Sequence, residues 1–189
     1  VWRPRELNTH ETEWGFSCMS YEISGALGIK MANPDKEVIS FVGDGSYLLN
    51  NTDIYSSVIT NNKLIIIVCD NGGFAVINRL QLFKGGNEYN NLLKSSNTPG
   101  LVNVDFAKHA ESMGAKSEHV NSISDLEEAF KRAKKSDVTY VISIKTHAYQ
   151  WLEGSAFWDS PTLEIPTTKE NKEALKLYKE GKNKQRQGV

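Results

Sequence analysis

The chain has 189 residues, of which 39% are hydrophobic and 24% charged, enough apolar material for one sizeable domain with its own core. Its net charge of −1 argues against a general role on nucleic acids or membrane surfaces. No apolar run approaches the ~18 residues of a membrane span. Cys18 and Cys69 form no CxxC pair and no secretory signal is visible, so we expect a cytoplasmic protein. The irregular polar start without Met suggests a domain of a longer protein, whose upstream domains are absent here.

The predicted elements alternate between helices and strands. In chain order we expect a helix at 19–32, a strand at 37–42, a helix at 47–60 with Ser46 as its N-cap, a strand at 63–69, a short helix at 74–82, a loop at 84–100, a helix capped by Asp105, a strand at 117–120, a helix opened by the capping box 124–127 and a strand at 138–144.

This alternation predicts a doubly wound α/β fold, a mostly parallel sheet with helices on both faces. The continuous apolar run 64–69 is typical of a strand that is covered on both sides. Residues 1–166 are expected to form one domain, and the polar residues 167–189 a C-terminal helical tail.

The most informative stretch places polar residues directly after two predicted strands. Asp44 belongs to the run GDGS at 43–46, and Asn71 belongs to DNGG at 70–73, 71 − 44 = 27 positions later. Ligands of open parallel sheets sit outside the carboxyl ends of the strands. A carboxylate, an amide oxygen and the carbonyl of Gly73 suit one Mg²⁺ ion, with diphosphate oxygens among its other ligands.

The glycines of the GDGS turn leave room for close approach of a ligand. The amides of Gly45 and Ser46, at a helix start, can hold phosphate oxygens. The alternative is a plain turn with Asn71 as a loop cap, and the complete strand–turn–helix–strand spacing favours the metal–diphosphate interpretation. ATP and NAD are disfavoured, because G-x-x-x-x-G-K-[ST] and G-x-G-x-x-G are absent.

GDGS followed by Asn71 resembles the cofactor signature of thiamine diphosphate enzymes. The resemblance implies their C-terminal, diphosphate-binding domain, with thiamine diphosphate and Mg²⁺ as cofactors. It also implies that Met19 wedges thiamine into its bent shape, the alternative being an ordinary core methionine. The cofactor-binding residues so implied are Ser17, Met19, Gly43, Gly45, Ser46, Asn71, Gly73 and Phe74, and the metal ligands are Asp44, Asn71 and Gly73.

A closer resemblance covers nearly the whole chain. The runs WGFSCMSYE at 14–22, DNGGFAVINRLQ at 70–81 and WD at 158–159 are similar to those of the trihydroxycyclohexane-1,2-dione hydrolases of myo-inositol catabolism. This implies hydrolysis of a carbon–carbon bond in a cyclic dione to give 5-deoxyglucuronate. It also implies a homodimer or homotetramer, with the cofactor between this domain and the pyrimidine-binding domain of a second subunit. The activating Glu would lie on that other domain, so no catalytic residue is assigned here and the isolated chain should be inactive.

Several alternatives stay open. The alternatives to a dione hydrolase are an acetolactate synthase-like carboligase, a 2-oxoacid decarboxylase and a non-catalytic α/β binding module. Asn78 and Arg79 either reach substrate or form a solvated helix face, and His147 is a weaker candidate. The aromatic residues Trp151, Phe157 and Trp158 either pack on the sheet edge or form a lid, and 84–91 is a candidate closing loop.

Overall fold

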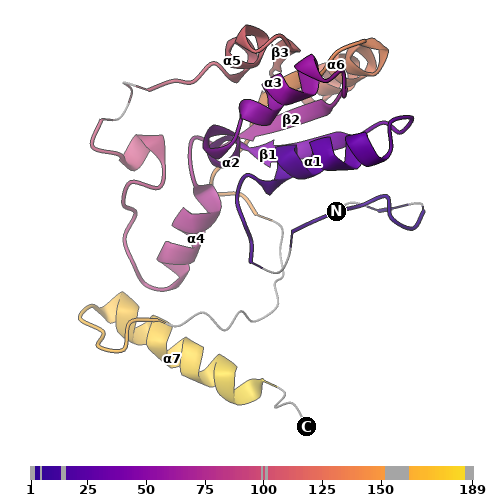
Figure 1. Cartoon of the computed structure of the whole chain (residues 1–189). Coiled ribbons are helices and arrows are strands. Elements are labelled where there is room, and N and C mark those ends of the chain that lie inside the picture. The colour runs from indigo at the N-terminus through magenta and orange to yellow at the C-terminus, as the bar shows by residue number, and fades with distance from the viewer. Residues whose placement is uncertain are drawn as a thin grey trace. The chain divides into compact units, whose positions relative to one another are not determined.

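The computed structural model describes residues 3–4, 6–13, 16–98, 100, 102–151 and 162–185 (Figure 1). The chain divides into two compact units. The first comprises Val1–Asp70 and Val104–Thr146, and the second comprises Asn71–Asn103 and His147–Val189. Within the described ranges, no helix is long and apolar enough to cross a membrane.

The first unit is built on a four-stranded sheet in which all neighbours run parallel. The strand order is β1-β2-β4-β3, and the register pairs Ile39 with Ile65 and Ile65 with Tyr140. The strands are β1 Ile39–Gly43, β2 Ile65–Asp70, β3 Lys116–Val120 and β4 Tyr140–Lys145. The predicted parallel sheet is therefore confirmed.

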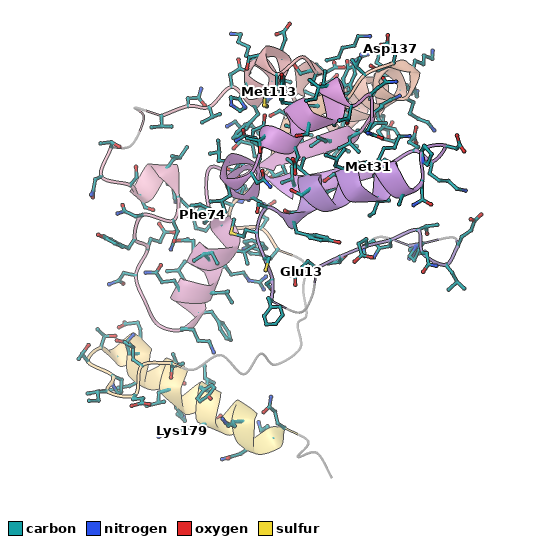
Figure 2. The ribbon with its side chains drawn as sticks, viewed as in Figure 1. Glu13, Met31, Phe74, Met113, Asp137 and Lys179 are labelled. Atoms are coloured by element: carbon teal, nitrogen blue, oxygen red, sulfur yellow. The ribbon has the colours of Figure 1, made fainter. Side chains whose placement is uncertain are left out.

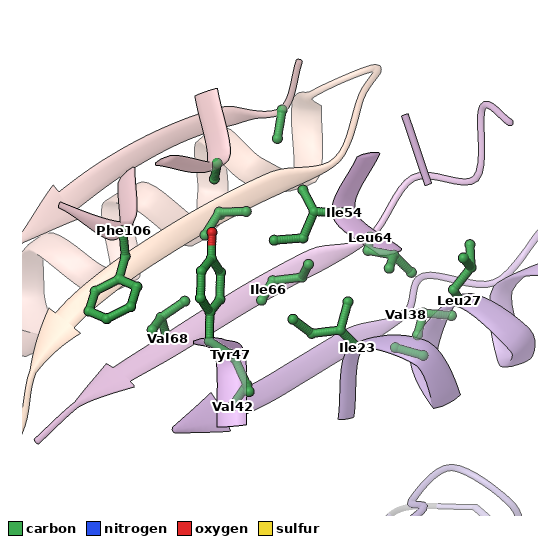
Figure 3. Packing of buried hydrophobic residues seen from close by; sticks show 14 residues of the cluster. Ile23, Leu27, Val38, Val42, Tyr47, Ile54, Leu64, Ile66, Val68 and Phe106 are labelled. Carbon is green, nitrogen blue, oxygen red and sulfur yellow. The ribbon is translucent and has the colours of Figure 1, made fainter. Parts of the chain in front are cut away.

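Helices cover both faces of this sheet. The helices of the first unit are α1 Tyr21–Ala32, α2 Asp44–Leu49, α3 Thr52–Ile59, α5 Phe106–Ser112 and α6 Ile123–Lys135. On one face, buried side chains of α1, α2, α3 and α5 pack against alternate strand residues in one cluster, which includes Ile23, Tyr47, Ile54, Phe106, Ile66 and Val68 (Figure 3).

The second face carries a separate apolar cluster. Ala129 and Ala133 of α6 pack there against Ile65, Ile67 and Ile142. Because successive residues of β2 alternate between the two clusters, almost all of that strand is buried, as its unbroken apolar sequence predicted. The doubly wound α/β fold is confirmed.

The helix starts differ from prediction in two places. The helix expected at 47–60 is two helices, and the first begins at Asp44 directly after Gly43, so Ser46 lies inside α2 and caps nothing. In α6 the N-cap is Ser122, whose side chain accepts from the Asp125 amide at 3.1 Å, two residues before the predicted box. The cap at Asp105 is confirmed.

The second unit contains α4 Ala75–Phe83, the 3₁₀ turn η1 Leu93–Ser95 and α7 Lys169–Lys184. The short helix predicted at 74–82 and the helix in the polar tail are confirmed. The expected loop at 84–100 contains η1, and Leu92 forms an isolated bridge with Gly73. Phe157 and Trp158 lie outside the described residues, and the domain boundary at 166 stays a prediction.

Candidate active site

The candidate diphosphate turn connects β1 to α2 without an intervening loop. Gly43 is the last residue of β1, and Asp44 is the first of α2. Asp44 is 3% exposed and Ser46 5% exposed. The amides of Asp44, Gly45 and Ser46 belong to the first helical turn, where backbone N–H groups have no acceptor within the helix. A negative ligand or side chain is favoured at this end of a helix.

The carboxylate of Asp44 lies close to the end of β2. Gly43 is paired with Cys69 in the parallel ladder. Burial raises the pKa of the Cys69 thiol, and the negative charge of Asp44 raises it further. In the first unit, the GDGS turn and the carboxyl end of β2 are therefore neighbours, as expected. Asn71 follows Asp70 in the sequence and opens the second unit.

The hydroxyl of Ser46 has a role that the sequence did not indicate. It accepts the Ser20 amide at 2.6 Å and donates to Glu22 Oε2 at 2.7 Å. Ser20 has a φ of 78°, a left-handed conformation that non-glycine residues seldom adopt. Ser46 and Glu22 thus fix the end of the loop that carries the candidate residues Ser17 and Met19. No local pattern reports these contacts, because Ser46 is 24 positions from Glu22 and 26 from Ser20.

Met19 is not an ordinary core methionine. It is 37% exposed, and it belongs to neither apolar cluster. Ser17, two residues before it, has a φ of 51°. The loop is therefore sharply turned and presents Met19 at the surface of the first unit. A wedge role for Met19 stays a prediction.

In the second unit, the candidate metal loop is held by backbone contacts. Gly73 has a φ of 139°, and a Cβ added there would lie 2.4 Å from the carbonyl oxygen of Asn91. The amide of Phe74 donates to that same oxygen at 2.7 Å, and the Leu93 amide donates to the Gly72 carbonyl at 2.9 Å. Only glycine fits at 73. Phe74, labelled in Figure 2, stands directly before α4.

Residues 1–144 match the family described as the thiamine pyrophosphate enzyme C-terminal TPP binding domain. The chain belongs to this family. A protein of Shouchella clausii named 3D-(3,5/4)-trihydroxycyclohexane-1,2-dione hydrolase is 38% identical over 92% of the chain, and one of Bacillus subtilis with the same name is 39% identical over 84%. The chain spans 27% and 25% of these two relatives, so it corresponds to about a quarter of their length.

A solved structure is also similar to this TPP-binding domain. It is a thiamine diphosphate-dependent 4-hydroxybenzoylformate decarboxylase of Rhodococcus jostii RHA1, with a TM-score of 0.61 and 27% identity. The match covers 68% of the present chain and 23% of that one.

The candidate ligands are oxygen donors, the chemical type that a Mg²⁺ ion on a diphosphate takes. Among the residues that the structure describes, no three His, Cys, Asp or Glu side chains gather into a metal site. A cation bound by Asp44 would therefore draw its other ligands from amide and carbonyl oxygens and from a phosphate. Within the second unit, Asn71 and Gly73 carry oxygens of this kind, which are the hard donors that Mg²⁺ prefers. Asp44, Asn71 and Gly73 each already have an interaction within the protein.

The candidate substrate residues separate into buried and exposed ones. Asn78 is 1% exposed, which excludes a solvated helix face for it. Arg79 is exposed, and its guanidinium lies 4.8 Å from the ring centroid of Trp151. His147 is exposed and accepts the Tyr149 amide through Nδ1 at 3.1 Å. Asn78 is therefore the one of these that the fold encloses.

Proposed function

We propose that this domain binds the diphosphate of thiamine diphosphate through Mg²⁺, with Asp44, Asn71 and Gly73 as the protein ligands. The observation that carries the proposal is the buried Asp44 carboxylate at the start of α2, beside the end of β2, in a chain of the TPP-binding family. An ionised carboxylate is a hard oxygen ligand of the kind that Mg²⁺ binds.

The remaining cofactor contacts follow from the same turn and its neighbours. The amides of Gly45 and Ser46 hold phosphate oxygens, and Gly43 lets the phosphate approach the backbone. Because the Ser46 hydroxyl is already shared between Ser20 and Glu22, its amide is the group that serves the phosphate. Ser17, Met19 and Phe74 contact the rest of the cofactor.

The proposed reaction of the whole protein is hydrolysis of a carbon–carbon bond in a trihydroxycyclohexane-1,2-dione, giving 5-deoxyglucuronate. The two hydrolases above, 38% and 39% identical, support it by their names. Thiamine diphosphate, when bound, supplies the carbon nucleophile and electron sink for such a cleavage. This chain holds and orients it.

The complete site needs a pyrimidine-binding domain from a second subunit, in a cytoplasmic homodimer or homotetramer. The Glu that activates the cofactor lies on that domain, so the 189-residue chain alone should show no turnover. Measurable turnover by the purified chain would contradict this assignment.

A 2-oxoacid decarboxylase is the second candidate, favoured by the structural similarity to the 4-hydroxybenzoylformate decarboxylase. The metal site would be the same in both cases. A substrate panel separates them. Ring opening of the cyclic dione supports the first function, whereas carbon dioxide release from an aromatic 2-oxoacid supports the second.

The experiment for the cofactor site is a calorimetric titration of the chain with thiamine diphosphate and Mg²⁺. We expect Asp44→Ala to weaken binding by about a hundredfold, because it removes the only carboxylate among the proposed ligands. Asp35→Ala, at an exposed aspartate, is the matched control and should bind as the unmodified chain does. Equal binding by Asp44→Ala and Asp35→Ala would reject the site, and an α/β module without cofactor would give no binding at all.

A further inference from the structure

The second unit contains a carboxylate that is held in place by side chains from two other segments. Glu88 Oε1 accepts the Tyr149 hydroxyl at 2.5 Å and the Asn78 amide nitrogen Nδ2 at 3.1 Å. Asn78 comes from α4, and Tyr149 follows β4 by four residues. The hydrogen bond from Tyr149, followed by that from Asn78, lowers the pKa of Glu88, which is therefore ionised at neutral pH.

Asn78 anchors this carboxylate from a buried position. The ionised carboxylate accepts and cannot donate, so it fixes the amide with Nδ2 toward Glu88 and Oδ1 away from it. The Asn78 Oδ1 atom is buried and has no hydrogen-bond partner in the part of the chain that the structure describes. A buried acceptor of this kind needs a donor, which an enclosed water can supply.

The second oxygen of Glu88 lies near a cation. The side chain is 28% exposed, and Oε2 lies 3.9 Å from the Lys94 ammonium nitrogen. That ammonium stands 4.1 Å from the ring centroid of Tyr149. At 3.9 Å the ion pair is too long for a hydrogen bond. Oε2 therefore has acceptor capacity available to a ligand, next to a positively charged donor.

We propose that Glu88 binds hydroxyl groups of a polyhydroxylated ring substrate, with Asn78 and Tyr149 as its positioning residues, an inference that rests on the proposed function. A hydroxyl donates to Oε2, and Lys94 donates to an adjacent oxygen of the same ring. The site thus pairs an acceptor with a donor, as a vicinal diol or hydroxyketone requires.

The arrangement of Glu88 and Lys94 favours ligands that carry hydroxyl groups. A ring without hydroxyl groups has no donor for Glu88 and leaves Oε2 of the carboxylate unsatisfied, which penalises its binding. A free carboxylate ligand would be repelled by Glu88. The ligand class is therefore a neutral ring that carries several hydroxyls.

The test uses the 189-residue chain with cyclohexane-1,2,3-triol as the probe, measured by saturation-transfer NMR with and without thiamine diphosphate and Mg²⁺. We expect Glu88→Gln to weaken triol binding about tenfold, because a charge-assisted hydrogen bond becomes a neutral one. Tyr149→Phe, which keeps the ring and removes one positioning contact, should weaken it about threefold. Cyclohexanone, which has no hydroxyl, should bind equally to all variants.

Glu118→Gln is the matched control, since Glu118 also accepts a tyrosine hydroxyl, from Tyr140 at 2.6 Å. It should leave triol binding unchanged. Triol binding that is the same in the unmodified chain and in Glu88→Gln, or absent from both, overturns the inference. If the triol binds through Glu88 but thiamine diphosphate does not bind, the hydroxyl site stands and the proposed cofactor function fails. If the cofactor binds and triol binding does not depend on Glu88, the proposed cofactor function stands and the hydroxyl site fails.

Discussion

Glu118 and Glu88 each accept a tyrosine hydroxyl, yet their surroundings differ. Glu118, in the first unit, also accepts Nε and Nη2 of Arg132, at 3.0 and 2.6 Å. Both of its oxygens are therefore taken by a bidentate guanidinium. Glu88, in the second unit, has two neutral donors on Oε1 and a lysine at 3.9 Å from Oε2.

The difference separates a structural carboxylate from an available one. Arg132 satisfies Glu118 within the protein, and the pair joins α6 to β3. Glu88 accepts two neutral donors on one oxygen, while the other lacks a close donor among the described residues. A carboxylate that is fixed and only half satisfied is arranged for a ligand, because its orientation is already determined before the ligand arrives.

The largest effect we expect concerns the backbone that holds the Glu88 loop in the second unit. Gly73→Ala should lower the free energy of unfolding by about 3 kcal/mol, because the new Cβ clashes with the Asn91 carbonyl and φ is unfavourable. Urea denaturation measures it. Gly72→Ala is the control: with a φ of 81° and open space around it, it should lose only about 1 kcal/mol. Equal losses of unfolding free energy in the two variants would show that the close contact at Gly73 does not add to the cost of an alanine there.

A smaller effect is expected at the satisfied hydroxyl of the first unit. Ser46→Ala should destabilise the chain by about 2 kcal/mol without cofactor, because the Ser20 amide and the Glu22 carboxylate both lose a partner. The measurement is again urea denaturation. Ser56→Ala, at an exposed hydroxyl with a long bond of 3.4 Å, should change stability by less than about 0.5 kcal/mol. If the Ser46→Ala chain is as stable as Ser56→Ala, the two hydrogen bonds of the Ser46 hydroxyl do not stabilise the fold.

The Glu118–Arg132 pair should make stability depend on acid pH. The hydrogen bond from Arg132 lowers the folded-state pKa of Glu118, so its contribution is complete above the unfolded value of about 4.3 and is lost as pH falls through the lower folded value. Glu118→Gln should therefore destabilise the chain by about 1 kcal/mol at pH 7 and by less near pH 3. Urea denaturation at both pH values tests this, and a loss that is independent of pH would contradict the assignment.

The sequence was sufficient for the parallel sheet because its apolar runs report burial directly. Residues 64–69 are apolar without a break, and β2 is buried on both faces. Helix starts were harder. Ser122 and Ser124 each stand three residues before an acidic residue, and local sequence does not decide which one caps α6. Ser46 was assigned a capping role that the extended Gly43 made unnecessary, since the helix begins at once after the strand.

The candidate site was predictable only where its residues are close in sequence. The GDGS turn follows its strand directly, so the position of Asp44 at the end of β1 could be inferred. The partners of Ser46 and Glu88 could not. Glu22 is 24 positions from Ser46, and Tyr149 is 61 positions from Glu88. Such contacts are set by tertiary packing, which leaves no period in the sequence.

The smallest expected change in stability distinguishes the two buried asparagines of the second unit. Asn171 Nδ2 donates to the Gly85 carbonyl at 2.5 Å, so Asn171→Leu leaves a backbone oxygen unpaired and should lower the free energy of unfolding by about 1–2 kcal/mol. Asn78→Leu also removes a hydrogen bond, but it removes the unpartnered Oδ1 with it, and the exposed Glu88 can turn to water. We expect a net change within about 0.5 kcal/mol, accompanied by weaker triol binding. The contrary result is an Asn78→Leu chain that loses as much stability as Asn171→Leu and keeps its affinity for the triol. Asn78 would then be a structural residue, and it would not position Glu88 for the ligand.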